Sequence, residues 1–157
     1  MEHKMRRTDR SLGEPEAREI MARAEHGFLA TVGEDGWPYG VPVNHVLAGN
    51  VLYFHCALAG HKLENLAHEA RVCYTAVASA EVVPEEITTL YESAVAFGRA
   101  RVVEDPAEKR RALELLGNRF CPGLEAKVQE AIRGTGAGTR VVRIDIERIT
   151  GKSNRPK

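Results

Sequence analysis

The segment TTLYESAVAFGRARVV, residues 88–103, is an unusually long run of residues that favour β-strands. Because neighbouring side chains of a strand point to opposite faces, one face would carry Leu90, Ala94, Ala96, Ala100 and Val102. The other face would carry Tyr91, Ser93, Val95 and Phe97. Both faces are apolar enough to need cover, so we expect one to face the protein's own core and the other to pack against a second subunit. Gly98 predicts a bulge or bend within the strand.

Hydrophobic alternation on either side of this strand predicts further strands. They are expected at 27–32, 41–47, 51–58, 71–79 and 139–152. Helical spacing predicts helices at 14–25, 62–70 and 105–120, followed by a short helix and a Gly-rich loop within 121–139. Six strands arranged as hairpins, with helices between them, favour a mainly β fold, a small antiparallel barrel, over a doubly wound parallel sheet.

Length and composition restrict the classes of function. A chain of 157 residues is of ordinary single-domain size, and its 22 basic and 22 acidic residues cancel. No overall field therefore attracts nucleic acid or an anionic membrane. The chain has no apolar run long enough to span a bilayer, and the basic segment at residues 1–10 lacks the apolar stretch of a signal peptide. Three cysteines without metal-ligand spacing are most simply reduced thiols, which favours a cytoplasmic protein.

The segment FHCALAGHKLENLAHE, residues 54–69, places a strand directly before a helix whose first turn is basic. The start of a helix exposes unpaired N–H groups and a partial positive charge, so an acidic or hydroxyl side chain is usual there. Gly60, His61 and Lys62 stand there instead. This composition is favourable where an external anion, most often a phosphate, caps the exposed N–H groups. The alternative, a solvated Lys62 and a helix capped by water, stays open.

Four histidines, His45, His55, His61 and His68, lie within a short region. They lack the acidic or thiolate partners that usually accompany metal ligands, so no metal site is predicted. His55 shares a strand face with Tyr53 and precedes the basic helix start, a position suited to lie beside a bound ring. A core histidine bonded to backbone is an equally good interpretation. Cys56 points to the opposite face from His55, so the two cannot act as nucleophile and base.

Several segments in order resemble one known family. YGVPVNHV, LYFHCALAGHKLENL, TTLYESAVAFGRARVVED and the closing IERITGK are similar to the nitroimidazole-resistance proteins of the pyridoxamine 5'-phosphate oxidase-like superfamily. The resemblance extends from about residue 6 to residue 152. It implies a single FMN-binding split β-barrel domain over residues 1–157, with its core at 14–152, that forms a homodimer and holds the flavin at the subunit interface. FAD is the alternative to FMN.

The resemblance also implies roles for individual residues. Lys62 and His61 match the basic pair that holds the flavin phosphate, and His55 matches the histidine that lies against the flavin in nitroimidazole reductases. The remaining matches are positions expected near the cofactor. They are Val43, Asn44 and His45 along the isoalloxazine, Tyr91 and Ser93 from across the interface, and Lys152.

Two functions from different classes follow. The first is an FMN-dependent oxidoreductase that reduces small organic acceptors, nitroaromatic compounds among them, with His55 as the catalytic proton donor. The second is a non-catalytic flavin- or haem-binding protein, in which His55 or His61 would ligate haem iron. The arginine-rich signature of the true pyridoxamine phosphate oxidases is not evident, so oxidation of vitamin B6 is not expected.

Overall fold

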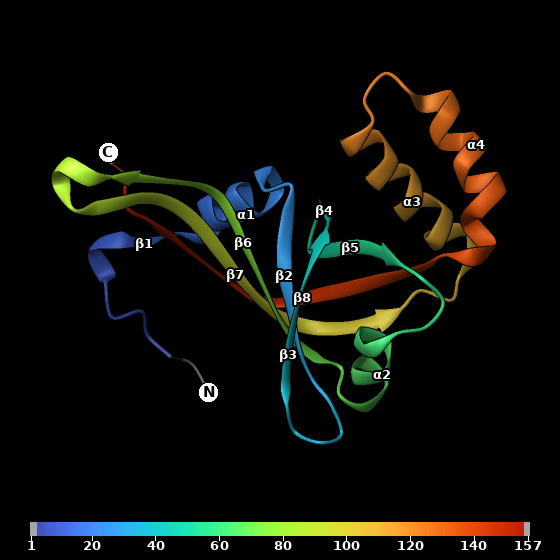
Figure 1. Cartoon of the computed structure of the whole chain (residues 1–157), viewed down its shortest axis with the longest axis horizontal. Coiled ribbons are helices and arrows are strands. Elements are labelled where there is room, and N and C mark those ends of the chain that lie inside the picture. Colours follow the sequence, from blue (N-terminus) through green and yellow to red (C-terminus); the bar gives the residue numbers. More distant parts are fainter. Residues whose placement is uncertain (1–2, 156–157) are drawn as a thin grey trace.

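One antiparallel sheet organises the protein, and the computed structural model describes residues 3–155 of it (Figure 1). Residues 1, 2, 156 and 157, which the predicted domain also includes, lie outside the described part. The strands are β1 (Ser11–Leu12), β2 (His26–Val32), β3 (Pro38–Asn44), β4 (Val46–Ala48), β5 (Val51–Cys56), β6 (Arg71–Val83), β7 (Thr88–Val102) and β8 (Arg140–Ser153). The α-helices are α1 (Glu14–Arg23), α2 (His61–His68), α3 (Pro106–Phe120) and α4 (Glu125–Thr135).

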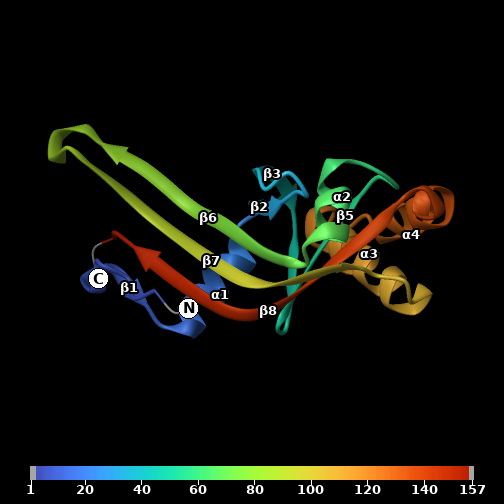
Figure 2. The ribbon, with the colours of Figure 1, turned by 90° about the horizontal axis from the view of Figure 1, so that it is seen from below.

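The order of the strands requires the sheet to close on itself. The hydrogen-bonded path is β3-β2-β6-β7-β8-β5-β4, and β1 pairs with β8. The two ends of this path, β3 and β4, are separated in the chain only by His45. The sheet must therefore curl until its two edges meet at that residue, which is a barrel. Figures 1 and 2 show this curvature, with β2 and β3 crossing the direction of β5 and β8.

The prediction of a mainly antiparallel β fold is confirmed, but the number of six strands was wrong, since the described chain contains eight. The expected strand at 41–47 is divided at His45, because β3 pairs with β2 whereas β4 pairs with β5. The other additional strand, β1, is two residues long, which is too short to produce a recognisable alternation.

The long strand β7 has the two faces that its sequence predicts. Ala94, Ala96 and Ala100 are buried in the barrel core, at most 4% exposed. The register with β8 shifts between Phe97 and Gly98, and a Cβ at Gly98 would lie only 2.1 Å from the carbonyl oxygen of Asp145. The predicted bulge is therefore confirmed. The opposite face remains open, with Phe97 39% exposed, and continues over the neighbouring strands β6 and β2 through Val77 and Phe28, which are 45% and 50% exposed.

Two hydrophobic clusters fill the fold. The larger one lies inside the barrel, where α1 packs with Ala17, Ile20 and Met21 fully or almost fully buried. The smaller one lies outside, between β5, β8 and α3, and includes Val141, Ala112 and Leu116. α3 begins as predicted, because Asp105 accepts a hydrogen bond from the N–H of Glu108 at 3.0 Å and Pro106 occupies the first turn.

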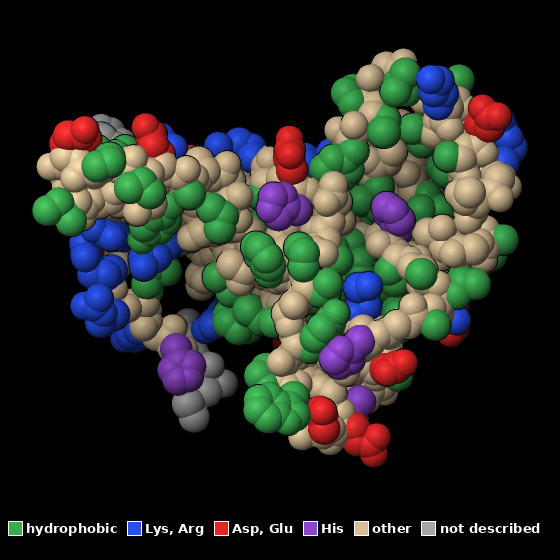
Figure 3. Space-filling view, viewed as in Figure 1, with side chains coloured by type: hydrophobic (Ala, Val, Ile, Leu, Met, Phe, Trp, Pro, Cys, Tyr) green, Lys and Arg blue, Asp and Glu red, His purple; other side chains and the backbone are tan. Residues whose placement is uncertain are grey.

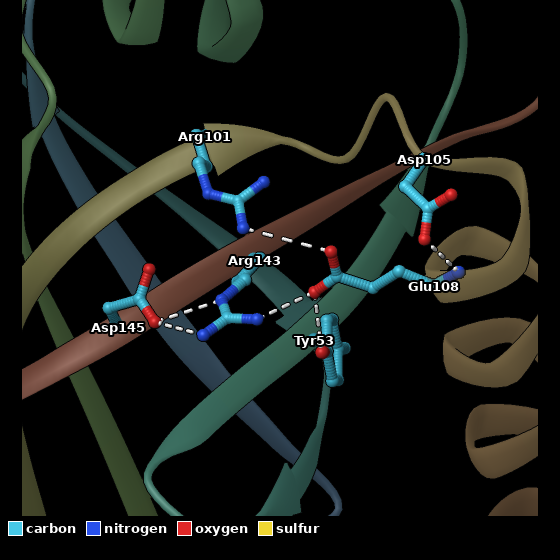
Figure 4. A network of polar contacts seen from close by, with 6 residues as sticks. All are labelled: Tyr53, Arg101, Asp105, Glu108, Arg143 and Asp145. Atoms are coloured by element: carbon cyan, nitrogen blue, oxygen red, sulfur yellow. Dashed lines mark hydrogen bonds and ion pairs between the residues drawn. The ribbon is translucent and has the colours of Figure 1, made fainter.

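A network of charged groups attaches α3 to the barrel (Figure 4). The Glu108 carboxylate on α3 accepts bonds from Tyr53 Oη on β5 at 2.8 Å and from Arg143 Nη1 on β8 at 2.7 Å. Arg101 on β7 lies 3.7 Å from the same carboxylate, and Arg143 also donates to Asp145. The bond from Arg143, followed by that from Tyr53, holds the pKa of Glu108 below 4.5. Three strands are therefore connected to the first turn of one helix.

Candidate functional site

The start of α2 has no capping side chain among the described residues, as its sequence predicts. The helix begins at His61. It follows Gly60, whose φ of 143° is a backbone conformation that residues with a Cβ atom rarely adopt. The N–H groups of Leu63 and Glu64 turn back to the carbonyl of Gly60, at 2.9 and 3.2 Å. The helix ends at His68, two residues before the predicted end at Ala70.

Neighbouring groups fix the orientation of this helix start. The ring of His61 lies on that of Tyr39, with centroids 4.0 Å apart, and Asn65 in the next turn donates to Thr31 on β2 at 2.9 Å. Lys62 is half-buried and forms no ion pair with a carboxylate of the described residues. Within the described residues the helix start therefore offers a lysine without a carboxylate partner and N–H groups that no side chain caps, although Glu64 is an acidic residue of the same turn.

Arg140 adds a second positive charge near Lys62, and the sequence reasoning missed it. It stands opposite Cys56 where β8 pairs with β5, and its Nε donates to the carbonyl of Leu58 at 2.9 Å. Burial raises the pKa of Cys56, and the charges of Lys62 and Arg140 partly oppose this rise. Both cations therefore lie near the same thiol. The only signal in the sequence is a basic residue at the start of the last strand, and without the register of that strand it cannot be placed opposite Cys56.

His55 is exposed on β5, and Cys56 faces the barrel core, so the predicted separation of the two side chains is confirmed. His55 and Asn44 line one pocket of 340 Å³. We call it the α3–α4 pocket, because side chains of these two helices form its walls. They include Leu113, Leu116, Phe120, Val128 and Ile132. Figure 3 shows hydrophobic and histidine side chains around the hollow beside these helices.

His45 is not at the surface. Its side chain is 0% exposed, its Nε2 donates to the carbonyl of Met21 at 2.7 Å, and its Nδ1 lies 2.8 Å from Tyr74 Oη. Burial lowers the pKa of His45, against the bond to Met21, which raises it. Both ring nitrogens are thus occupied inside the core, so the side chain of His45 supports the fold, and the position of this residue along the isoalloxazine stays a prediction. Of its neighbours, Val43 is half-buried and Asn44 is exposed.

Tyr91, Ser93 and Lys152 lie together, but at the other end of the chain's long strands. Ser93 faces Lys152 across the β7–β8 pair, and the Lys152 ammonium lies 5.6 Å from the centre of the Tyr91 ring. Burial raises the pKa of Tyr91, but bonds from Lys152 and Arg10 outweigh this and lower it. Figure 2 shows these ends of β7 and β8 far from α2 and β5. One chain therefore does not bring the two groups of predicted residues together.

Other sequence signals have structural explanations. The predicted Gly-rich segment, GTGAG at 134–138, lies at the end of α4 and in the 3₁₀ turn that follows. No group of three or more His, Cys, Asp or Glu side chains in the described part could hold a metal ion. Cys56, Cys73 and Cys121 are free thiols. No helix within residues 3–155 has the length and apolar character needed to cross a membrane.

Comparisons with known proteins identify the family to which the chain belongs. A family model for pyridoxamine 5'-phosphate oxidase matches residues 13–153, so the chain belongs to that family. A comparison with curated proteins gave no match.

Among solved structures, a candidate 5-nitroimidazole antibiotic resistance protein from Bacteroides thetaiotaomicron is 24% identical, with a TM-score of 0.73 over 90% of this chain and 85% of that one. An FAD- and haem-binding protein from Mycobacterium smegmatis is 25% identical, with a TM-score of 0.78 over 92% and 72%. A conserved hypothetical protein from Mycobacterium tuberculosis is 19% identical, with a TM-score of 0.82 over 97% and 91%.

Proposed function

We propose that this protein is an FMN-dependent oxidoreductase that reduces small organic acceptors, nitroaromatic compounds among them. One observation carries the proposal: an uncapped basic helix start follows, a few residues later in the chain, a strand whose exposed histidine lines an apolar pocket. The first feature suits a phosphate and the second suits a ring compound. Family membership supports a flavin as the compound whose phosphate binds at the helix start, with FAD as the alternative to FMN, and the pocket beside His55 then receives the acceptor.

The residues of the α2 start fit the phosphate end of such a cofactor. Lys62 would donate a charge-assisted bond to a phosphate oxygen, and the N–H groups of the first turn would donate further bonds. His61, held on Tyr39, would limit access from one side, and Arg140 would add positive charge. No internal carboxylate of the described chain has to be displaced from Lys62.

The protein's part in the reaction is to position groups and to move a proton. The flavin, when bound, supplies the electrons, because no protein side chain can do so. His55 is exposed and lines the pocket, so its imidazole can give a proton to an oxygen of the acceptor as that oxygen gains charge. Asn44 lines the same pocket and can donate an amide hydrogen bond to the same group. The walls from α3 and α4 exclude water from the acceptor.

A homodimer would bring the two separated groups of residues together. The open face of β2, β6 and β7 exposes Phe28, Val77 and Phe97, and is the surface that we propose for the second subunit. Tyr91, Ser93 and Lys152 of the partner would then complete the cofactor site. Sedimentation should show a dimer, and Phe97→Glu should shift it to a monomer with reduced flavin content. A monomeric protein that retains flavin fully would contradict this arrangement.

The decisive experiment is the visible absorption spectrum of the purified protein, with the released ligand identified by mass. We expect an oxidised-flavin spectrum and release of FMN. Lys62→Ala should retain at least tenfold less flavin in dialysis, whereas Lys127→Ala, on the exposed part of α4, should retain the wild-type amount. A protein that neither contains FMN nor binds added FMN would overturn the proposal.

A second candidate function is a flavin- or haem-binding protein without turnover. It is favoured by the exposed His55 beside an apolar pocket, which is a common setting for a haem ligand, and by the flavin- and haem-binding protein of Mycobacterium smegmatis. Addition of haem would then give a Soret band that His55→Ala or His61→Ala shifts. The oxidoreductase proposal predicts no such band and a flavin that transfers electrons to nitro compounds.

A further inference from the structure

We propose that the α3–α4 pocket binds an uncharged, largely apolar compound of one or two rings, with its polar end against His55 and Asn44. That this compound is the electron acceptor rests on the proposed function, whereas its binding does not. The walls of the pocket come from α3, a helix that the sequence predicts at 105–120, and from α4, which the sequence predicts only as a short helix within 121–139.

The size of the pocket decides the class of ligand. Its volume is 340 Å³, compared with the roughly 150 Å³ of a cavity that accepts a benzene ring. One ring with substituents, or two fused rings, would fill it. The volume also lies at the lower end of the range of about 300–1,000 Å³ for small-molecule sites. Larger ligands would have to extend out of the pocket.

The chemistry of the walls selects against charge. Among residues 3–155, no Asp, Glu, Lys or Arg lines the pocket. The two threonines in the lining have hydroxyl groups that already donate to backbone carbonyls, Thr135 to Ala131 at 2.8 Å and Thr139 to Thr135 at 3.1 Å. Asn44, His55 and the Cys121 thiol are therefore the polar side chains left for a ligand. An ionised group placed among the apolar walls would lose its hydration without a partner.

The pocket is preformed, because α3 and α4 are locked together on each side of it. A Cβ at Gly117 of α3 would lie 2.3 Å from Val128 Cγ1, so only glycine permits this close approach. Lys109 Nζ donates to the carbonyl of Gly136 at 2.7 Å, and Arg110 donates to Gln129 at 2.7 Å. The Glu108 network holds the same helix on the barrel. A ligand therefore does not have to order these walls when it binds.

Equilibrium dialysis with nitrobenzene tests the inference. We expect wild-type protein to bind nitrobenzene and to bind 4-nitrobenzoate, the same ring with a carboxylate, at least tenfold more weakly. Ala131→Phe would place a ring in the pocket and should weaken nitrobenzene binding at least tenfold. Ala126→Phe changes the same helix outside the pocket lining and should leave binding unchanged. Equal binding of nitrobenzene by the two variants, with matching thermal melting, would overturn the inference.

The native thiols provide a second measurement that needs no variant. Cys121 lines the pocket and Cys73 on β6 does not. Nitrobenzene should slow alkylation of Cys121 by iodoacetamide, measured by mass, and leave the rate at Cys73 unchanged. Equal effects at both thiols would contradict a bound ring.

Failure of this inference can be distinguished from failure of the proposed function. If nitrobenzene protects Cys121 but the protein never binds FMN, the pocket inference stands and the proposed oxidoreductase function is wrong. If the protein binds FMN but nitrobenzene does not protect Cys121, the flavin proposal stands and the pocket inference is wrong. Flavin content is therefore measured in every sample.

Discussion

His45 and His55 are ten positions apart in the sequence, and the structure places them in opposite surroundings. His45 lies in the barrel core with a partner on each ring nitrogen, whereas His55 is exposed and lines the α3–α4 pocket. The comparison teaches that a histidine's role follows from what satisfies its nitrogens. In the core the imidazole stabilises the fold, and beside the pocket it remains free to serve a ligand.

The largest expected effect is a loss of stability when His45 is replaced. His45→Ala removes a fully buried ring, leaves the Met21 carbonyl without its donor and removes one of the two partners of Tyr74 Oη, the other being the Val43 carbonyl. A cavity and two broken hydrogen bonds should lower the free energy of unfolding by about 2–4 kcal/mol. Urea denaturation measures it. A loss smaller than that of an exposed substitution such as His68→Ala would show that His45 does not support the barrel.

The matching change in the second region should affect turnover instead. His55→Ala should reduce the rate of nitro-compound reduction about 100-fold, the lower end for loss of a general acid. Its stability should stay within about 0.5 kcal/mol of wild type, because the side chain is exposed. Flavin content should be unchanged. A variant with the wild-type rate at pH 7 would remove His55 from the mechanism.

A third change tests how firmly the wall of the pocket is attached. Glu108→Gln weakens the bonds to Tyr53 and Arg143 and leaves part of the Arg143 charge without a partner. We expect a loss of about 1–2 kcal/mol in unfolding free energy, together with weaker nitrobenzene binding. Glu104→Gln, an exposed change just before α3, is the control. If both variants behave alike, the network does not hold the helix.

The smallest effect is a dependence on pH that belongs to His45. Burial lowers the pKa of His45 below 6.5, and Arg119 and His26 contribute in the same direction. The unfolded chain therefore binds a proton that the folded protein does not, so stability is complete above pH 6.5 and falls as the pH drops below it. The slope cannot exceed about 1.4 kcal/mol per pH unit.

Denaturation at pH 7.5, 6.5 and 5.5 measures this slope. His45→Gln should lose the slope, because glutamine does not titrate. Carboxylates such as Glu108, whose pKa is held below 4.5, contribute only in more acidic solution. An unchanged slope in His45→Gln would assign the effect to another group.

Much of the fold could be predicted from local sequence patterns, and particular residues show which features such patterns cannot predict. The alternation in β7, the bulge at Gly98 and the cap at Asp105 are local properties, and each is confirmed. The burial of His45 is not local, because it depends on Met21 and Tyr74, which are brought to it by the closure of the sheet. Sequence periodicity cannot reveal such a pairing.

The candidate site divides in the same way. The open basic start of α2 follows from Gly60, His61 and Lys62 in succession, so the sequence alone indicated it. The sequence alone did not indicate the pocket, because Asn44, His55 and the walls from α3 and α4 come from distant segments. The sequence predicted a short helix within 121–139, but not the helix against which it packs. The roles of the predicted residues stay predictions until the cofactor is identified.

The position of β8 has a consequence for biosynthesis. This strand lies between β7 and β5 and also pairs with β1, so it joins segments from the beginning and the middle of the chain. The sheet cannot close before residues 140–153 have left the ribosome. Until then the hydrogen-bonding edges of β5 and β7 have no partner, and such edges pair readily with other chains. Nascent chains of this protein should therefore depend on chaperones until Ser153 has left the ribosome.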